Sequence, residues 1–338
     1  MSNIKFLVLG PRINHKQGAG GAVVLFENLI EELDLAGLSY TLIDTNKNNY
    51  RRKSLSILNI VYQYILLRKK HDVVFFNSSR DYIYLLPLFL FFNIISPKKI
   101  ALRKFGGELD QDLTKPVKGA IIKSLLKRLD VLFVESKLLL NAVKKYNVNT
   151  HWFPNVRKKN TANGDLNTYN KQFAFISHIK ASKGVNELLN AFKDLDSSYC
   201  LHFYGAVVEP ALLDLITSTP NIEYKGQVLP ANVYDTINKY DVIVLPTYYA
   251  GEGYPGILIE AYACGKPVIS TNWKQVPEIV DDGSTGYLIT PRSITELKAA
   301  ITKINNDNYQ VLRKNAIVKF YDFDSSVVSK RIFKTLLI

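Results

Sequence analysis

Short apolar runs alternate with segments of helical spacing along the whole chain. The run KFLVLG at 5–10 is followed by Pro11, and residues 22–33 then place apolar side chains at the spacing of a helix. Five further runs in the first half have the length and composition of strands, namely 40–44, 72–77, 98–104, 130–135 and 150–153. Because helix-length segments separate these runs, the pattern predicts parallel strands with helices on both faces.

A polar stretch at 157–171 interrupts this alternation, which restarts at residue 173. The strand-like runs of the second half are 173–178, 200–205, 221–226, 241–247 and 266–271. We therefore predict an α/β protein of two facing, doubly wound Rossmann-like domains, with ligands at the carboxyl ends of the strands. The predicted parts are a first domain at 1–156, a linker at 157–171, a second domain at 172–316, and a C-terminal helix at 317–338 that packs back on the first domain.

The composition, with 47% hydrophobic and 22% charged residues, is that of an ordinary globular protein. The longest apolar run, at 82–95, contains Pro87 and is shorter than the ~20 residues of a membrane-spanning helix, so we expect a buried or membrane-facing helix. Cys200 and Cys264 lack metal-ligand or redox spacing, which predicts packed, reduced thiols. No signal peptide is visible, and we expect a cytoplasmic protein, with possible peripheral contact to the inner face of the membrane.

The net charge of +13 is concentrated in the first half of the chain. Residues 1–156 contain 23 Lys and Arg against 12 Asp and Glu, a net charge of +11, and the remainder contains 20 against 18. This asymmetry favours an anionic membrane surface or nucleic acid as partner, with an ordinary solvated surface as the alternative. A helix predicted at 115–129 alternates cations with apolar residues, which suits either a membrane interface or packing on its own sheet.

The stretch EGYPGILIEAYACGKPVIS at 252–270 carries the most informative chemistry. Pro255 predicts the start of a helix, whose positive end suits an anion. The backbone amides at this end are those of Gly253, Tyr254 and Gly256. Glu260 lies in the middle of the apolar helix, where an ionised carboxylate needs a partner. Either two ribose hydroxyls or the backbone of a neighbouring loop would supply one.

This stretch resembles the signature of the family 4, or group 1, glycosyltransferases of the GT-B fold. It has two glutamates separated by seven residues, a Gly-aromatic-Pro loop and a GKPV ending, and the resemblance extends through 240–253 and 276–289. In that family the first glutamate holds hydroxyls of the donor sugar and the second holds the ribose of the nucleotide. The resemblance gives these roles to Glu252 and Glu260.

The segment FISHIKASKGVNELLNAF at 175–192 resembles the part of the family in which a basic residue and a lysine five positions later hold the donor diphosphate. Lys183 matches the lysine, and Gly184 opens a helix whose dipole favours an anion. His178 stands where the family usually has arginine, and a neutral imidazole supplies a hydrogen bond without a charge. The resemblance thus makes Glu252, Lys183 and His178 the catalytic candidates.

Two glycines near the N-terminus, Gly20 and Gly21, resemble the family's glycine loop, which approaches the donor. The cluster does not fit a dinucleotide-binding fingerprint, because Val23 occupies the position of the third glycine. Gly226, the last residue of the run at 221–226, and Val228 complete the expected donor-binding residues.

The acceptor-side candidates lie at 102–110, at the end of a predicted strand, where many relatives carry a histidine-glycine pair. This chain has Arg103, Phe105, Gly106, Gly107 and Asp110 in that stretch. Arg103 and Asp110 are candidates for holding the acceptor, and a salt bridge at the strand end is an equal alternative for each.

The resemblance implies a retaining hexosyltransferase, independent of metals and cofactors, that uses a UDP- or GDP-linked sugar. The acceptor would be a saccharide or a lipid-linked saccharide of a bacterial surface polysaccharide. Lys183 and the helix start at 253–256 would stabilise the diphosphate leaving group, which then takes the acceptor proton. A nucleotide-sugar epimerase or a phosphorylase with two similar domains remains an alternative. A basic nucleic-acid binder is a third, although no binding module for nucleic acid is recognisable.

Overall fold

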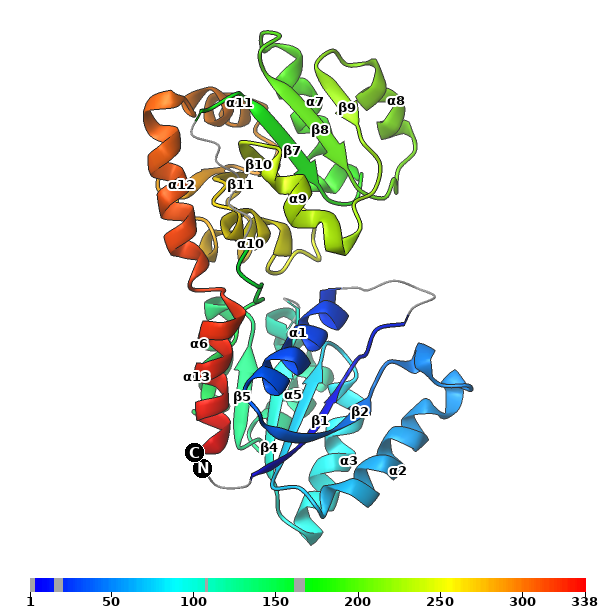
Figure 1. The fold of residues 1–338 in the computed structure, drawn as a ribbon. Coiled ribbons are helices and arrows are strands. Elements are labelled where there is room, and N and C mark those ends of the chain that lie inside the picture. Colours follow the sequence, from blue (N-terminus) through cyan, green and yellow to red (C-terminus); the bar gives the residue numbers. More distant parts are fainter. Residues whose placement is uncertain (1–3, 15–20, 107–108, 161–167) are drawn as a thin grey trace. The chain divides into compact units, whose positions relative to one another are not determined.

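The computed structural model describes residues 4–14, 21–106, 109–160 and 168–338. The chain forms two compact domains (Figure 1). The first domain consists of residues 1–156 together with 325–338, and the second of residues 157–324.

The first domain is built on a parallel sheet of six strands in the order β2-β1-β3-β4-β5-β6. The strands are β1 (Lys5–Gly10), β2 (Ser39–Asp44), β3 (Val73–Ser78), β4 (Lys99–Lys104), β5 (Val131–Val134) and β6 (Thr150–Trp152). All six residues of β3 are buried, because helices cover both faces of the sheet around it.

Helices cover both faces of the first sheet. Side chains of α2 (Ser56–Arg68), α3 (Tyr82–Ile95), α4 (Leu109–Thr114), α5 (Pro116–Leu126) and α6 (Lys137–Val143) form one hydrophobic core with the sheet. Side chains of α1 (Gly21–Leu35) and of the C-terminal helix α13 (Ser325–Leu337) form the core on the other face. The short 3-10 helices η1 (Lys47–Asn49) and η2 (Lys53–Leu55) connect β2 to α2.

The second domain repeats this plan with the strand order β12-β11-β10-β7-β8-β9, again all parallel. Its strands are β7 (Gln172–Ile176), β8 (Cys200–Tyr204), β9 (Ile222–Tyr224), β10 (Val242–Leu245), β11 (Val268–Thr271) and β12 (Gly286–Ile289). Its helices are α7 (Val185–Lys193), α8 (Ala211–Ser218), α9 (Val233–Asn238), α10 (Gly256–Ala263), α11 (Ile294–Lys303) and α12 (Asn306–Phe320), with the 3-10 turns η3 (Ala181–Lys183), η4 (Pro230–Asn232) and η5 (Val276–Glu278).

The prediction of two Rossmann-like α/β domains is confirmed, and the eleven predicted strands all occur within two residues of their expected bounds. The N-terminal part of the first domain extends to Val156, and residues 325–338 complete this domain. The described parts of the predicted linker, 157–160 and 168–171, lie in the second domain, and α12 runs through the predicted second boundary at 316/317. Cys200 is half-buried and Cys264 is buried, and both are free thiols.

Candidate active site

The second sheet changes its direction of growth at β7. The chain moves from β7 to β8 and β9 on one side, and then returns to β10, β11 and β12 on the other. The carboxyl ends of β7 and β10 therefore border the switch point, where ligands of open α/β sheets bind. Two loops follow these strand ends, residues 177–184 and 246–255.

The two loops are in close contact. The backbone N–H of Tyr248 donates a hydrogen bond to the carbonyl of Ser182 over 2.9 Å. Gly184 has a φ of +85°, and a Cβ atom on it would lie 2.3 Å from the carbonyl oxygen of Pro246. Only glycine suits both the left-handed backbone and this close approach. Gly184 thereby holds the residue before it, Lys183, against the loop that follows β10.

Lys183 and Glu252 meet at this point. Nζ of Lys183 lies 2.6 Å from Oε2 of Glu252, and the two side chains are 12% and 9% exposed. The hydroxyl of Thr247 donates to the same carboxylate oxygen over 2.6 Å. Among the described residues, no group donates a hydrogen bond to Oε1 of Glu252. The pair thus provides a cation and a carboxylate with one oxygen available to a ligand.

An aromatic ring and a second cation border this ion pair. The ammonium groups of Lys183 and Lys180 each lie 5.0 Å from the centre of the Tyr249 ring. Such a ring stabilises a nearby cation through its negative face. Lys180, Thr247 and Tyr249 were not predicted as site residues. Lys180 is close to Lys183 in sequence, and Thr247 and Tyr249 lie on the loop after β10. These positions are the signal that would have indicated the three residues.

Helix α10 begins beside Glu252. Its N-cap is Pro255, and no side chain caps the helix by a hydrogen bond. The first backbone N–H groups of a helix have no partner within the helix, so this end favours an anion. The side chain of Tyr254 points away from such a ligand, because it is buried and its hydroxyl donates to Glu278 over 2.6 Å. Gly253, Tyr254, Pro255 and Gly256 are therefore candidates through their backbone alone.

Glu260 has a partner that the sequence did not indicate. Nε of Arg157 lies 2.6 Å from Oε1 of Glu260, with the side chains 12% and 19% exposed. A Cβ atom on Gly256 would lie 1.8 Å from the guanidinium of Arg157, so the absence of a side chain there makes room for the arginine. The partner of Glu260 in the structure is thus a charged side chain and not the backbone of a neighbouring loop. A carboxylate accepts several hydrogen bonds, so this pair does not exclude ribose hydroxyls.

The other donor-side candidates lie at or after neighbouring strand ends, or outside the described residues. His178 is exposed, and the described residues include no hydrogen bond from it to Lys183 or Glu252. Gly226 has a φ of +84°, and its carbonyl accepts a hydrogen bond from Gly205, while Val228 is half-buried. Gly21 is the exposed first residue of α1 in the first domain. Gly20 lies outside the described residues.

Arg103 and Phe105 lie inside the first domain. The Arg103 side chain is 1% exposed, and its guanidinium stacks on Phe153 and donates to the carbonyl of Pro154 over 3.2 Å. Burial lowers the pKa of Arg103 to about 9, although the charge of Glu135 opposes this shift. Phe105 is also buried. These positions favour a packing role at the strand end over contact with an acceptor.

The remaining acceptor-side candidates are only partly buried. The N–H of Gly106 donates to Oε2 of Glu135 over 3.2 Å. Asp110 lies in the first turn of α4, and its Oδ1 is buried without a hydrogen-bond partner. Gly107 lies outside the described residues. Asp110 therefore keeps an unused acceptor atom, as a ligand-binding carboxylate would.

A polar hollow of ≈ 550 Å³ lies at the carboxyl ends of β1, β2 and β3 in the first domain. These strands border the switch point of the first sheet, which grows from β1 to β2 on one side and to β3 on the other. Its polar lining includes Asn14, Asn46, Asn48, Asn77, Ser78 and Ser79. Amide and hydroxyl groups of this kind both donate and accept hydrogen bonds, as sugar hydroxyls require.

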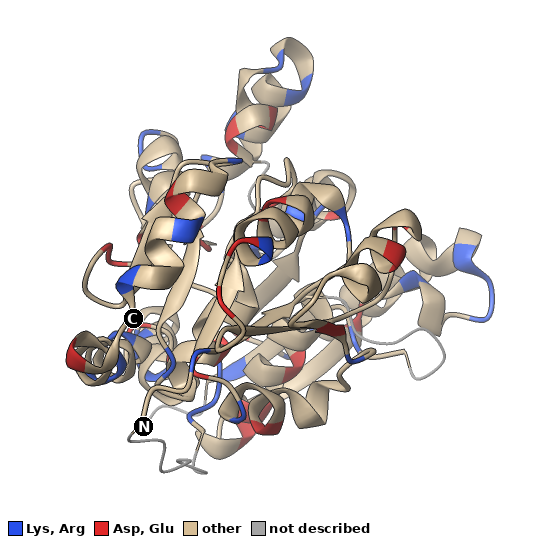
Figure 2. Cartoon of the chain, turned by 90° about the horizontal axis from the view of Figure 1, so that it is seen from above, with Lys and Arg blue, Asp and Glu red and all other residues tan. Residues whose placement is uncertain are grey.

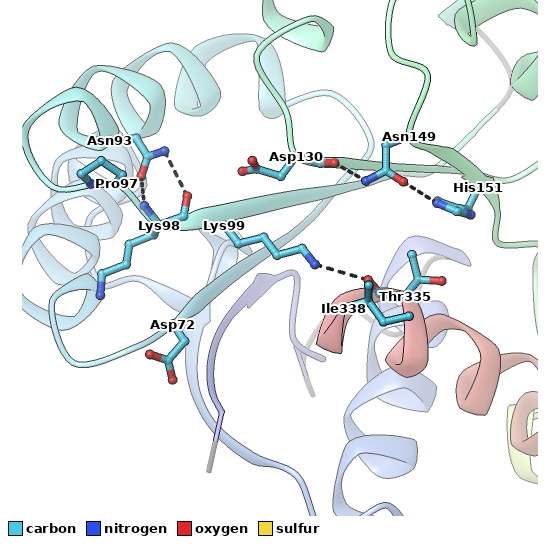
Figure 3. A pocket seen from close by; sticks show the side chains of 10 residues that line it. All are labelled: Asp72, Asn93, Pro97, Lys98, Lys99, Asp130, Asn149, His151, Thr335 and Ile338. Atoms are coloured by element: carbon cyan, nitrogen blue, oxygen red, sulfur yellow. Dashed lines mark hydrogen bonds between the residues drawn. The ribbon is translucent and has the colours of Figure 1, made fainter. Parts of the chain in front are cut away.

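A larger hollow, of ≈ 900 Å³, lies at the opposite, amino-terminal edge of the same sheet (Figure 3). Its carboxylates already accept hydrogen bonds from the backbone, Asp72 from Lys5 and Asp130 from Ile100. Lys99 donates to the carbonyls of Thr335 and Leu336, which fixes the end of α13 there. Because these groups serve the fold and ligands favour the other edge, we do not regard this hollow as the active site.

Comparisons with known proteins agree with this geometry. Residues 170–307 match the family of glycosyl transferases group 1. The chain is 24% identical to the uncharacterized glycosyltransferase MJ1069 of Methanocaldococcus jannaschii, over 70% of this chain and 66% of that protein. It is 30% identical to the capsular polysaccharide biosynthesis glycosyltransferase CapM of Staphylococcus aureus, over 39% of this chain and 36% of that protein. The chain thus spans no more than 66% of the length of either relative.

A solved structure covers nearly the whole chain. Anabaena Alr3699/HepE in complex with UDP has a TM-score of 0.77 at 16% identity, over 99% of this chain and 100% of that one. The predicted resemblance to group 1 glycosyltransferases of the GT-B fold is confirmed by these matches. The narrower assignment to family 4 stays a prediction.

Two kinds of feature are absent from the described residues. No helix among them combines the length and the apolar character that crossing a bilayer requires. They also contain no cluster of three or more His, Cys, Asp or Glu arranged to hold a metal ion.

Proposed function

We propose that this protein is a retaining glycosyltransferase that moves a hexose-type sugar from a UDP- or GDP-linked donor to a saccharide or a lipid-linked saccharide. The observation that carries the proposal is the Lys183–Glu252 pair at the switch point of the second sheet, within the segment that matches the group 1 glycosyltransferases. The similarity to a capsular polysaccharide enzyme and to a fold solved with UDP supports a nucleotide-sugar donor and a surface polysaccharide as product.

The chemistry follows from the charges at the site. Breaking the bond between sugar and diphosphate places negative charge on the leaving phosphate. Lys183 and the N-terminus of α10 neutralise that charge without a metal ion. Glu252 accepts hydrogen bonds from the sugar hydroxyls through Oε1, while Thr247 keeps Oε2 in place. The acceptor hydroxyl gives its proton to the leaving phosphate.

The pairing of Lys183 with Glu252 also explains how the site tolerates both charges. Each group neutralises the other while the donor is absent, which reduces the cost of burying them. A bound donor supplies a diphosphate for the cation and hydroxyls for the carboxylate, so neither loses a partner. The polar hollow at the strand ends of the first domain is the proposed place for a saccharide acceptor, since its amides and hydroxyls suit sugar hydroxyls.

Release of nucleoside diphosphate from a panel of UDP-, GDP- and ADP-sugars, with and without saccharide acceptors, tests this function. We expect acceptor-dependent release from a UDP- or GDP-sugar, undiminished by excess chelator. The anomeric configuration of the product, determined by NMR, should equal that of the donor. Interconversion of the sugar without an acceptor would indicate an epimerase, dependence on free phosphate would indicate a phosphorylase, and an inverted product would contradict the retaining mechanism.

Glu260 is expected to contribute to nucleotide affinity as well as to the fold. Replacing it with glutamine removes the charge that a ribose hydroxyl would contact, and a hydrogen bond to a charged group contributes about 1.5–3 kcal/mol. Glu260→Gln should therefore weaken nucleoside diphosphate binding about tenfold or more in calorimetric titration. The matched variant Arg157→Gln breaks the same ion pair from the other side, and it should lower thermal stability while keeping affinity within a few-fold. Equal affinity in the wild type and Glu260→Gln would leave this carboxylate as the partner of Arg157 only.

A further inference from the structure

Two helices of the first domain expose apolar side chains on the faces that point away from the sheet. On α2 these are Leu58, Tyr62 and Leu66, and on α3 they are Tyr84, Phe91, Ile94 and Ile95, each between 53% and 75% exposed. The opposite sides of both helices are buried in the core, through residues such as Ile60 and Phe89. Both helices are therefore apolar on the side that faces the core and on the side that faces the solvent. Large apolar side chains on the exposed faces of two neighbouring helices mark a site of interaction.

The two helices pack against each other and form one surface. Tyr64 of α2 stacks on Phe89 of α3 with 4.1 Å between the ring centres. Arg68, the last residue of α2, donates to the carbonyl of Ser96 and to Asn93 near the end of α3. The helices thus run in the same direction and end together, as Figure 1 shows for the pair α2 and α3. We call the exposed residues of these two helices the α2–α3 face.

Positive charge surrounds this face. The segment 45–107 contains 12 Lys and Arg against 2 Asp and Glu, and nine of these cations are not buried, all except Arg68, Arg103 and Lys104. Neither α2 nor α3 contains an acidic residue. Exposed cations lie before α2 at Arg51, Arg52 and Lys53, and after it at Lys69 and Lys70 (Lys and Arg are blue in Figure 2).

The two acidic residues of this segment do not neutralise the cations near the α2–α3 face. Asp81 pairs with Lys47 over 3.0 Å, and Asp72 accepts a hydrogen bond from the backbone of Lys5. An apolar centre with cations at both ends of the helices complements an anionic lipid bilayer, which offers phosphates at its surface and hydrocarbon beneath. Two copies of the chain joined through this face would instead bring like charges together.

We propose that the α2–α3 face docks on an anionic lipid bilayer, with both helices lying in the plane of the interface. The helices have 13 and 14 residues, too few to span a bilayer but enough to lie along it. Tyr62, Tyr84 and Phe91 enter the headgroup region, where aromatic rings are favoured. This proposal goes beyond the proposed sugar transfer and does not depend on it.

The helix expected at 115–129 is a weaker candidate for this contact. Lys115 and Lys118 both pair with Asp112, over 2.7 and 2.6 Å, and their charge is thereby partly neutralised. Ile122, Leu125 and Leu126 of α5 are buried against the first sheet. Most of its apolar face therefore packs on its own domain.

Sedimentation with vesicles tests the proposal through matched variants. The apolar variant Leu58→Ser/Phe91→Ser/Ile95→Ser alters the face, and its control Leu215→Ser/Val311→Ser/Val318→Ser alters exposed apolar residues of the second domain. The charge variant Arg51→Glu/Arg52→Glu/Lys53→Glu is matched by Lys193→Glu/Lys239→Glu/Lys314→Glu, which changes the net charge equally at exposed positions of the second domain.

We expect the wild type and both controls to bind vesicles containing phosphatidylglycerol and not vesicles of phosphatidylcholine alone. Both face variants should bind at least about tenfold more weakly. Binding should weaken as salt shortens the Debye length from ~10 Å at 0.1 M to ~3 Å at 1 M. Thermal unfolding of each variant, together with sugar transfer to a soluble acceptor, separates loss of docking from loss of folding or activity.

A depth measurement on a folded, single-site variant completes the test. The tryptophan of Phe91→Trp should shift its emission to the blue on phosphatidylglycerol vesicles and be quenched by brominated lipid, beyond the response of native Trp152 and Trp273 in the wild type. Three results would overturn the proposal: no binding of the wild type to anionic vesicles, equal loss in a face variant and its control, or an unquenched Phe91→Trp. A wild-type dimer that the apolar variant dissociates would make the face a contact between copies instead.

Discussion

Replacing Lys183 with methionine is expected to lower kcat/KM for sugar transfer by about a hundredfold or more. Its ammonium is the cation closest to Glu252 at the switch point, and removing one preorganised electrostatic contact to a developing oxyanion costs about 3–4 kcal/mol in the barrier. Methionine is unbranched like lysine and only one atom shorter, so the loop after β7 retains its packing. Steady-state kinetics with the donor identified in the panel measure the effect.

The matched control is Lys193→Met, which removes an exposed lysine at the end of α7 in the same domain. Its kinetics should stay within twofold of the wild type, because no group of the site contacts it. Thermal unfolding of both variants shows whether they are folded. A folded Lys183→Met enzyme with wild-type kcat/KM would remove Lys183 from the site.

Replacing Glu252 with glutamine is expected to reduce transfer by a similar factor, for a different reason. Two hydrogen bonds from sugar hydroxyls to a carboxylate, at about 1.5–3 kcal/mol each, exceed what a neutral amide oxygen provides. A net loss of about 3 kcal/mol corresponds to roughly a hundredfold in rate. The same variant frees Lys183 from its ion pair, so binding of a nucleoside diphosphate without a sugar should be equal or tighter.

The effect of Glu252→Gln on transfer reports contact with the sugar, and its effect on diphosphate binding reports contact with the nucleotide. Kinetics with the complete donor and calorimetry with the diphosphate alone measure them. Weaker diphosphate binding combined with unchanged transfer would contradict the role of Glu252. In a double-mutant cycle with Lys183→Met, the two losses should be smaller together than their sum, because the residues are in direct contact.

The fold could be predicted because each strand is a short apolar run and each connection is long enough for a helix. Even weakly apolar strands such as β9 (Ile222–Tyr224) appear where the alternation requires them. The exception is β12 (Gly286–Ile289), which has four residues and begins at a glycine with a φ of +153°. The connection from β11 (Val268–Thr271) to β12 contains only the 3-10 turn η5, so the alternation of strands with helix-length segments does not indicate a strand there.

The centre of the site could be predicted only through the family resemblance. Lys183 and Glu252 are 69 residues apart in sequence, and the parallel order of β7 and β10 brings them together. The partner of Glu260 could not be predicted, because Arg157 lies 103 residues away in a segment that appeared to be a linker. Tertiary packing likewise determines that the Tyr254 side chain points into its domain and that Arg103 is buried, so neither could be predicted from the sequence.

The surface proposed for membrane contact also required the structure. An amphipathic pattern at 115–129 suggested one helix, but the pattern alone does not indicate which side of a helix faces the sheet. The run at 82–95 is apolar all round, so its exposed residues are recognisable only once Phe89 and its neighbours are seen to be buried.

The most direct test of the central claim, that the Lys183–Glu252 pair forms a nucleotide-sugar site, is calorimetric titration of the wild type and Lys183→Met with UDP and with GDP. We predict that the wild type binds one of the two nucleotides at one site per chain. Lys183→Met, shown to be folded by its thermal transition, should bind the same nucleotide at least about tenfold more weakly, because a charge-assisted contact to the diphosphate is lost. Equal affinity in both proteins, or no binding of either nucleotide by the wild type, would contradict the account.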